Sequence, residues 1–254
     1  MNFFFGINNQ IFKSELQIPI FKNRELNPLN LNLYKCYPKN NKWILEDASK
    51  FRVNEYFFIL KNQDISEKDL FFLADKSIHD SFDYKKLKNF NNYTDSFPAY
   101  RANLKIFEKH NNGFSSYQSE YPYSMVPKKG SIVSAINSLS DPQADKNYIL
   151  IKNIFAEPIE ENFKGYLVDY NKKRIEEEFN LKTNYLNCIE VNNKQIKPDI
   201  FFVTKNYLGV PMYVSIKNEF ISFEHTHPPH EYVLSDNRYT KISEFKKKIN
   251  EIIS

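Results

Sequence analysis

Glycine is scarce in this chain: 5 of the 254 residues are glycine, and no two of them lie close together. Rossmann and P-loop nucleotide sites need several glycines within a few residues, and the nucleophile elbow of α/β-hydrolases needs a glycine on each side of its serine. The sequence therefore excludes a glycine-rich phosphate-binding loop and a hydrolase elbow of the usual kind.

Cysteine is almost as rare, with only Cys36 and Cys188. They form no CxxC pair and have no zinc-finger spacing, so two free thiols in a reducing compartment are expected, with a distant disulfide as the alternative. The first residues lack the basic and apolar regions of a secretory signal, and no apolar run is long enough to span a membrane. These absences predict a soluble cytoplasmic protein without a membrane span.

Charge of one sign is also limited, because the formal net charge is +4. Dedicated nucleic-acid binders carry a stronger basic excess. The densest basic run, Lys246–Lys248, is typical of the solvated face of a terminal helix. We therefore expect no nucleic-acid partner.

Aromatic residues are abundant, at 16% of the chain, and they occur in short runs with β-branched residues. Runs of four to eight such residues between Asn, Asp, Lys and Pro are typical of strands. The clearest runs are 30–37, 54–60, 69–74, 102–107, 147–155, 165–170, 199–204, 211–216 and 220–225. Short strands without regular strand–helix alternation predict a mainly antiparallel β protein.

Helical spacing is clear only at the C-terminus. Ile242, Phe245, Ile249 and Ile252 recur on one face of a helix, and Ser235 or Asp236 could cap its first turn. Two shorter helices are predicted near residues 76–90 and 129–139.

Four segments of the first half recur in the second half in the same order, which indicates an internal duplication. A chance likeness between β segments of biased composition is the alternative. The matched pairs are 20–28 with 150–158, 33–60 with 165–191, 69–74 with 199–204, and 98–122 with 211–229.

The predicted fold is therefore mainly β, with two duplicated antiparallel β-sandwich-like units packed together and a C-terminal α-helix. Residues 1–122 form the first repeat, with a helical or loop insert near 76–97. Residues 123–148 form a connector, and residues 149–254 form the second repeat and the helix. Each unit is close to the common size of a domain.

Three of the five histidines lie within six residues, in FEHTHPPHEY (223–232). On a strand, His225 and His227 point to the same face, so their imidazoles can converge on one Zn, Fe or Mn ion. The spacing of His225, His227 and Glu231 also resembles the first metal motif of cupins. This likeness covers seven residues only, because the flanking glycines and the second, histidine-containing motif of cupins are missing.

The duplication adds a carboxylate to this cluster. If Pro122 matches Pro229, then Glu120 matches His227 and Gln118 matches His225. Were the two strands to face each other, Glu120 would complete a two-histidine, one-carboxylate metal site with open positions for substrate. The predicted ligands of a divalent metal are His225, His227, Glu231 and Glu120.

Polar aromatic side chains surround the same strand ends, and such residues are common at ligand surfaces. The candidate substrate-binding residues are Tyr117, Gln118, Tyr121 and His230. The leading hypothesis is a soluble metal-binding β protein which, if it is an enzyme, acts on a small polar or carbohydrate-like substrate. The alternative is a non-catalytic β-sandwich module that binds a glycan or a protein.

Overall fold

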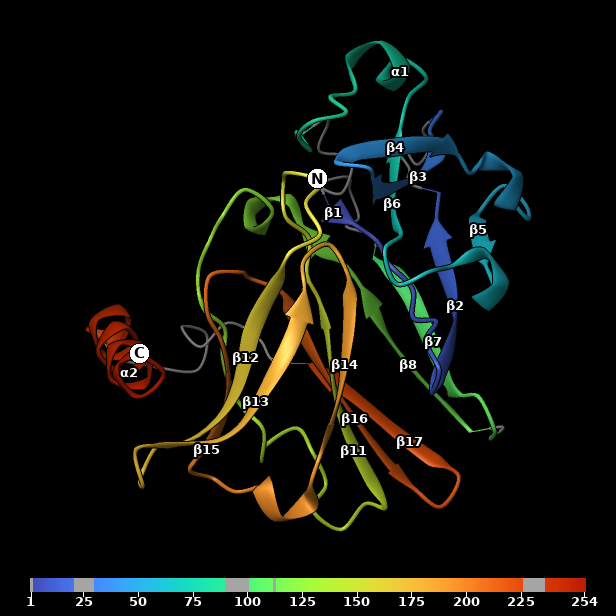
Figure 1. Ribbon diagram of the computed structural model, residues 1–254. Helices are drawn as coiled ribbons and strands as arrows, with labels where there is room; N and C mark the ends of the chain where they lie inside the picture. The colour runs from blue at the N-terminus through green and yellow to red at the C-terminus, as the bar shows by residue number, and fades with distance from the viewer. Residues whose placement is uncertain (1, 21–29, 90–100, 112, 226–235) are drawn as a thin grey trace.

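The structure is a computed structural model, and it describes residues 2–20, 30–89, 101–111, 113–225 and 236–254. The described chain is mainly β, with antiparallel strand pairs and one long helix at the C-terminus (Figure 1). Neither α-helix in these ranges has the length and apolar character needed to cross a membrane.

The first half of the chain contributes two sheets. Sheet I has the order β5-β2-β7-β8 and sheet II the order β4-β3-β6. The elements are β1 (Asn2–Phe3), β2 (Phe12–Pro19), β3 (Asn32–Lys39), β4 (Lys42–Asp47), the 3₁₀ helix η1 (Ser49–Phe51), β5 (Phe57–Leu60), the 3₁₀ helix η2 (Asn62–Asp64), β6 (Leu70–Ala74), α1 (Ile78–Ser81), β7 (Ala102–Glu108), β8 (Phe114–Ser119) and β9 (Tyr121–Pro122).

The second half also contributes two sheets. Sheet III has the order β14-β11-β16-β17 and sheet IV the order β10-β15-β12-β13. The elements after the 3₁₀ turn η4 (Tyr123–Met125) are β10 (Val133–Ala135), β11 (Lys146–Lys152), β12 (Asn162–Asp169), β13 (Arg174–Lys182), β14 (Leu186–Val191), the 3₁₀ helix η5 (Asn193–Gln195), β15 (Ile200–Thr204), β16 (Val210–Lys217), β17 (Phe220–His225) and α2 (Arg238–Ile252).

The two halves have the same topology. Each strand of sheet III is the ninth strand after its counterpart in sheet I, and the same shift relates sheet II to β13-β12-β15 of sheet IV. The same shift relates β1 to β10. Phe4, directly after β1, forms a β-bridge with Phe71 of β6, and in the second half β10 pairs with β15, the counterpart of β6. The predicted fold, two duplicated antiparallel β-sandwich-like units with a C-terminal helix, is confirmed.

The segment predicted as a connector contains regular structure. β10 lies within residues 123–148, and β11 begins at Lys146. A strand therefore replaces the helix predicted near 129–139, because Val133–Ala135 pair with Phe201–Val203 of β15. In the predicted insert near 76–97, the four-residue helix α1 is present, and residues 90–97 lie outside the described ranges. The predicted domain boundaries stay a prediction.

The central strands β11 and β16 of sheet III are buried on both faces, which joins the two halves. Ile149 and Ile151 of β11 pack in a cluster with sheet IV, whereas Tyr148 and Leu150 belong to the large cluster of the first half. The rings of Tyr148 and Phe12 of β2 meet edge to face, with their centroids 5.2 Å apart. The nearly continuous apolar run in β11 follows from this double burial.

Helix α2 covers the outer face of sheet IV (Figure 1). Ile249 of the predicted stripe is buried against Tyr166, Val168 and Val203, and Phe245 and Ile252 are partly buried there. Ile253, directly after the helix, is also buried in this cluster. The helix begins at Arg238 after Asn237, two residues beyond the predicted cap Asp236, and Ser235 lies outside the described residues.

Asparagine takes the backbone conformation that glycine usually adopts in turns. Positive φ angles between 52° and 79° occur at none of the glycines, at Lys173 and at five asparagines: Asn40, Asn41, Asn184, Asn206 and Asn218. Short polar side chains tolerate this left-handed region better than other side chains do. Asn40 and Asn41 form the two-residue turn between β3 and β4.

Candidate functional site

The two strands beside the predicted metal ligands lie next to each other. β8 and β17 are equivalent edge strands of sheets I and III, and they contact each other without being paired. The ring of Tyr117 lies 4.4 Å from the ring of His225, centroid to centroid, and its hydroxyl is within hydrogen-bonding distance of the imidazole. The structure therefore brings together two of the predicted site residues, one from each repeat.

The other predicted residues on β8 and β9 have different surroundings. Gln118 and Glu120 both contact Arg101, whose Nε lies 3.5 Å from the Glu120 carboxylate. Tyr121 has no exposed surface, and its hydroxyl donates a hydrogen bond to the carbonyl of Ile154 at 3.2 Å. Tyr121 thus ties the first half to the loop after β11, and burial raises its pKa.

The predicted metal site falls largely outside the described residues. His227, His230 and Glu231 lie in the segment 226–235, of which nothing is described. In the remaining ranges, no three or more His, Cys, Asp or Glu side chains are grouped so that they could hold a metal ion. The site built from His225, His227, Glu231 and Glu120 stays a prediction.

A second candidate site, which the sequence analysis missed, is a polar pocket on the outer side of sheet II. The pocket has a volume of about 290 Å³ and lies where η1 and η2 approach β3 and β4. Its charged lining residues are Lys35, Glu46, Asp47, Lys50, Asp64 and Asp69. The carboxylates outnumber the ammonium groups, so the pocket presents mainly hydrogen-bond acceptors.

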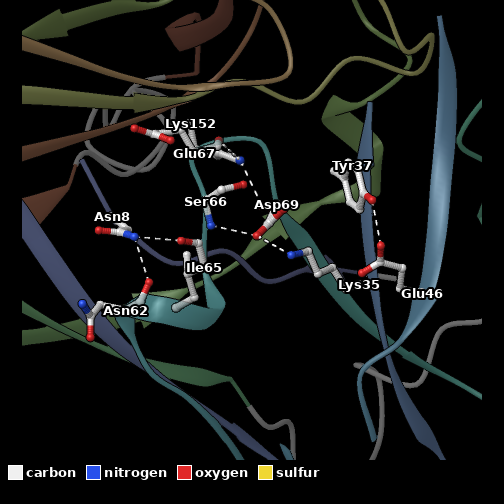
Figure 2. A network of polar contacts seen from close by, with 10 residues as sticks. All are labelled: Asn8, Lys35, Tyr37, Glu46, Asn62, Ile65, Ser66, Glu67, Asp69 and Lys152. Atoms are coloured by element: carbon white, nitrogen blue, oxygen red, sulfur yellow. Dashed lines mark hydrogen bonds and ion pairs between the residues drawn. The ribbon is translucent and has the colours of Figure 1, made fainter. Parts of the chain in front are cut away.

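Asp69 is the most buried of these charges, with 2% of its surface exposed. One carboxylate oxygen accepts a hydrogen bond from the backbone N–H of Ser66 at 2.7 Å and lies 3.0 Å from Nζ of Lys35 (Figure 2). A buried carboxylate requires such partners, because an unpaired charge in the interior is costly. The pair gives the pocket an acceptor and a donor in fixed positions.

Lys152, at the end of β11, lies behind this wall and is completely buried. Its Nζ donates hydrogen bonds to the carbonyls of Glu67 at 2.8 Å and Asp69 at 3.1 Å (Figure 2). Burial lowers the pKa of Lys152 to about 7, although the charges of Asp69 and Glu67 oppose this shift. Lys152, which belongs to the second repeat, therefore holds the backbone of Glu67 and Asp69 in place beside the pocket of the first repeat.

Two of the three remaining carboxylates, Glu46 and Asp47, are fixed in place by local hydrogen bonds. Glu46 accepts from the hydroxyl of Tyr37 at 2.7 Å, and this bond raises the pKa of Tyr37 to about 12. Asp47 accepts from the backbone N–H of Ser49 at 2.7 Å, which lowers the pKa of Asp47. Each uses one oxygen in this way, so the carboxylates are oriented before any ligand arrives.

The same sheet face is apolar in the second repeat. Lys35 pairs with Phe71 across β3 and β6, and the equivalent pair across β12 and β15 is Val168 with Phe201. Val168 is buried beneath α2, whereas Lys35 faces the polar pocket. A charge where the second repeat has a buried valine indicates that the two copies have diverged at this face.

One signal in the sequence pointed toward these residues. The matched segments 20–28 and 150–158 share a Lys-Asn pair, which in the second copy is Lys152-Asn153, and 69–74 begins with Asp69. The repeated segments thus included Lys152 and Asp69, but they did not show that these two residues lie close together in space.

Comparison with known proteins finds no matching family model, no matching curated protein and no matching solved structure.

Proposed function

We propose that this protein is a carbohydrate-binding β-sandwich module and that the polar pocket of sheet II holds the sugar. The observation that carries the proposal is the pocket of about 290 Å³ with the Lys35–Asp69 pair in its wall. Its size is close to the lower end of ordinary small-molecule sites, about 300 Å³, and suits one sugar residue.

The chemistry of the lining supports a polyhydroxylated ligand. Each sugar hydroxyl donates one hydrogen bond and accepts others. Carboxylates accept from such hydroxyls, and the ammonium groups of Lys35 and Lys50 donate to them. Phe51 and Ile65 add apolar surface to the same pocket, against which the C–H face of a sugar ring can pack.

The divergence of the repeats supports the same site. The second repeat covers the equivalent face with α2, and the first repeat places charged side chains there. The first repeat therefore leaves this face open to a ligand, whereas the second repeat packs a helix against it.

The proposal is tested by saturation-transfer difference NMR with a panel of unprotected monosaccharides at millimolar concentration. We expect signals from at least one sugar with the wild-type protein. Lys35→Met and Lys50→Met should each weaken binding about tenfold or more, because each removes a charged hydrogen-bond donor. Lys164→Met, on β12 of the second repeat, is the matched control and should bind as the wild type does. Absence of any signal, or equal binding by all variants, would overturn the proposal.

The metal-binding hypothesis is the second candidate, and one observation favours it. Its geometry requires the ends of β8 and β17 to meet, and Tyr117 contacts His225 there. The test is metal content by inductively coupled plasma mass spectrometry after incubation with Zn, Fe and Mn salts. This hypothesis expects near-stoichiometric metal in the wild type and in the control His79→Ala, and none in a folded His225→Ala/His227→Ala variant. A wild-type protein without metal would remove this candidate.

A further inference from the structure

A second cavity, of about 420 Å³, lies between α2 and the edge of sheet IV. Its apolar lining comes from three elements: Val133 and Ala135 of β10, Phe201 of β15, and Ile242 and Phe245 of α2. The cavity belongs to the second repeat, so it is separate from the polar pocket.

The cavity exists because α2 packs on the sheet mainly through its C-terminal half. Ile249 and Ile253 are buried, whereas Ile242 and Phe245 on the same apolar stripe are only half-buried. Sheet IV ends at β10, which pairs with β15 alone among the described strands. The first half of the apolar stripe therefore faces a space that the described residues leave open, and apolar surface of this kind is a common ligand site.

Two lysines complete the lining, Lys241 and Lys246. At about 100° per residue, they fall on opposite edges of the apolar stripe of α2. Within the described ranges, no ion pair involves either of them. An apolar cavity with two ammonium groups on its wall is complementary to a molecule with an apolar tail and an anionic head.

We propose that this cavity binds an amphiphilic carboxylate, a saturated fatty acid of medium chain length. The tail packs against Ala135, Phe201 and Phe245, and the carboxylate pairs with Lys241 and Lys246. Its volume lies within the range of about 300–1,000 Å³ that is usual for small-molecule sites. This binding is independent of the proposed function, because the two sites share no residue.

The test is isothermal titration calorimetry of the full-length protein with sodium octanoate, decanoate and dodecanoate, each below its critical micelle concentration. Affinity should rise about fourfold for each added methylene until the cavity is full. Decanol and decyltrimethylammonium, which lack the carboxylate, should bind about tenfold more weakly than decanoate. Light scattering, run beside the calorimetry, reports whether the protein is a monomer or a dimer.

Three variants locate the binding. Lys241→Met/Lys246→Met should lose the preference for decanoate over decanol, and the matched control Lys247→Met/Lys248→Met should keep it. Ala135→Phe, which fills the cavity, should abolish binding of every chain length, so the test stands even if the double Met variant does not fold.

The proposal is overturned by any of four results. The first is no binding of any fatty acid by the wild type, and the second is equal affinity for decanoate and decyltrimethylammonium. The third is unchanged binding by the folded Ala135→Phe variant. The fourth is a dimer that Ala135→Phe converts to a monomer, since a second copy would then be the occupant.

Discussion

Replacement of Lys152 by methionine should change how the stability of the protein depends on pH. The lysine is buried with a pKa of about 7, against an ordinary value of 10.5. Between these two pH values the unfolded chain holds a proton that the folded protein has released. The free energy of unfolding therefore rises with pH across this window, and the contribution of Lys152 is unfavourable and constant below pH 7.

The slope follows from the size of the shift. One unit of pKa difference corresponds to about 1.4 kcal/mol, so Lys152 contributes at most about 1.4 kcal/mol per pH unit above pH 7. Between about pH 7 and 8.5, the wild type should gain about 2 kcal/mol relative to Lys152→Met. Burial raises the pKa values of Cys36 and Cys188, so at higher pH these thiols lower the free energy of unfolding as the pH rises. This effect is the same in the wild type and in Lys152→Met.

The assay is urea unfolding followed by the fluorescence of Trp43, the only tryptophan. Trp43 is buried and donates a hydrogen bond from Nε1 to the carbonyl of Ala156 at 2.8 Å, so it reports on the contact between the halves. Lys164→Met, which changes an exposed lysine, is the control and should keep the wild-type slope. Parallel pH profiles for the wild type and Lys152→Met would refute the reasoning.

Three further changes test the packing and the turns. Leu150→Ala should destabilise the protein by about 2–5 kcal/mol, because it opens a cavity between sheets I and III, and urea unfolding should still show one transition. Gly113→Ala should lower the melting temperature measured by circular dichroism, because the added Cβ would lie 1.9 Å from the carbonyl oxygen of Glu219. An unchanged melting temperature would contradict this contact between the β7–β8 and β16–β17 hairpins. Asn41→Ala should cost about 1 kcal/mol in the same unfolding assay, because its φ of 58° disfavours alanine, whereas Asn41→Gly should cost little.

The sequence predicted those features that depend on neighbouring residues. The short aromatic and β-branched runs and the apolar stripe of α2 are local patterns, and the structure shows them as strands and as a helix packed on sheet IV. The ordered repeats predicted the duplication, because copies of one fold keep the order of their strands. They also predicted that β8 and β17 are equivalent, which placed Tyr117 and His225 on corresponding strands.

The features that the sequence did not predict depend on distant pairing. β10 is a strand because β15, almost seventy residues later in the chain, pairs with it, and its own sequence suggested a helix. The sequence did not predict the polar pocket for the same reason. Its Lys35, Asp69 and the supporting Lys152 lie on three separate strands or their ends, and each alone resembles an ordinary surface charge.

The burial of β11 and β16 on both faces has a consequence for the synthesis of the chain. The core of the first half includes Tyr148 of β11, Val214 of β16 and Phe223 of β17. A ribosome-bound chain that ends before these strands leaves the inner face of sheet I exposed to water and to other chains. The first half completes its core only after the chain has been made through β17, so folding proceeds through long-range contacts and is expected to be slow.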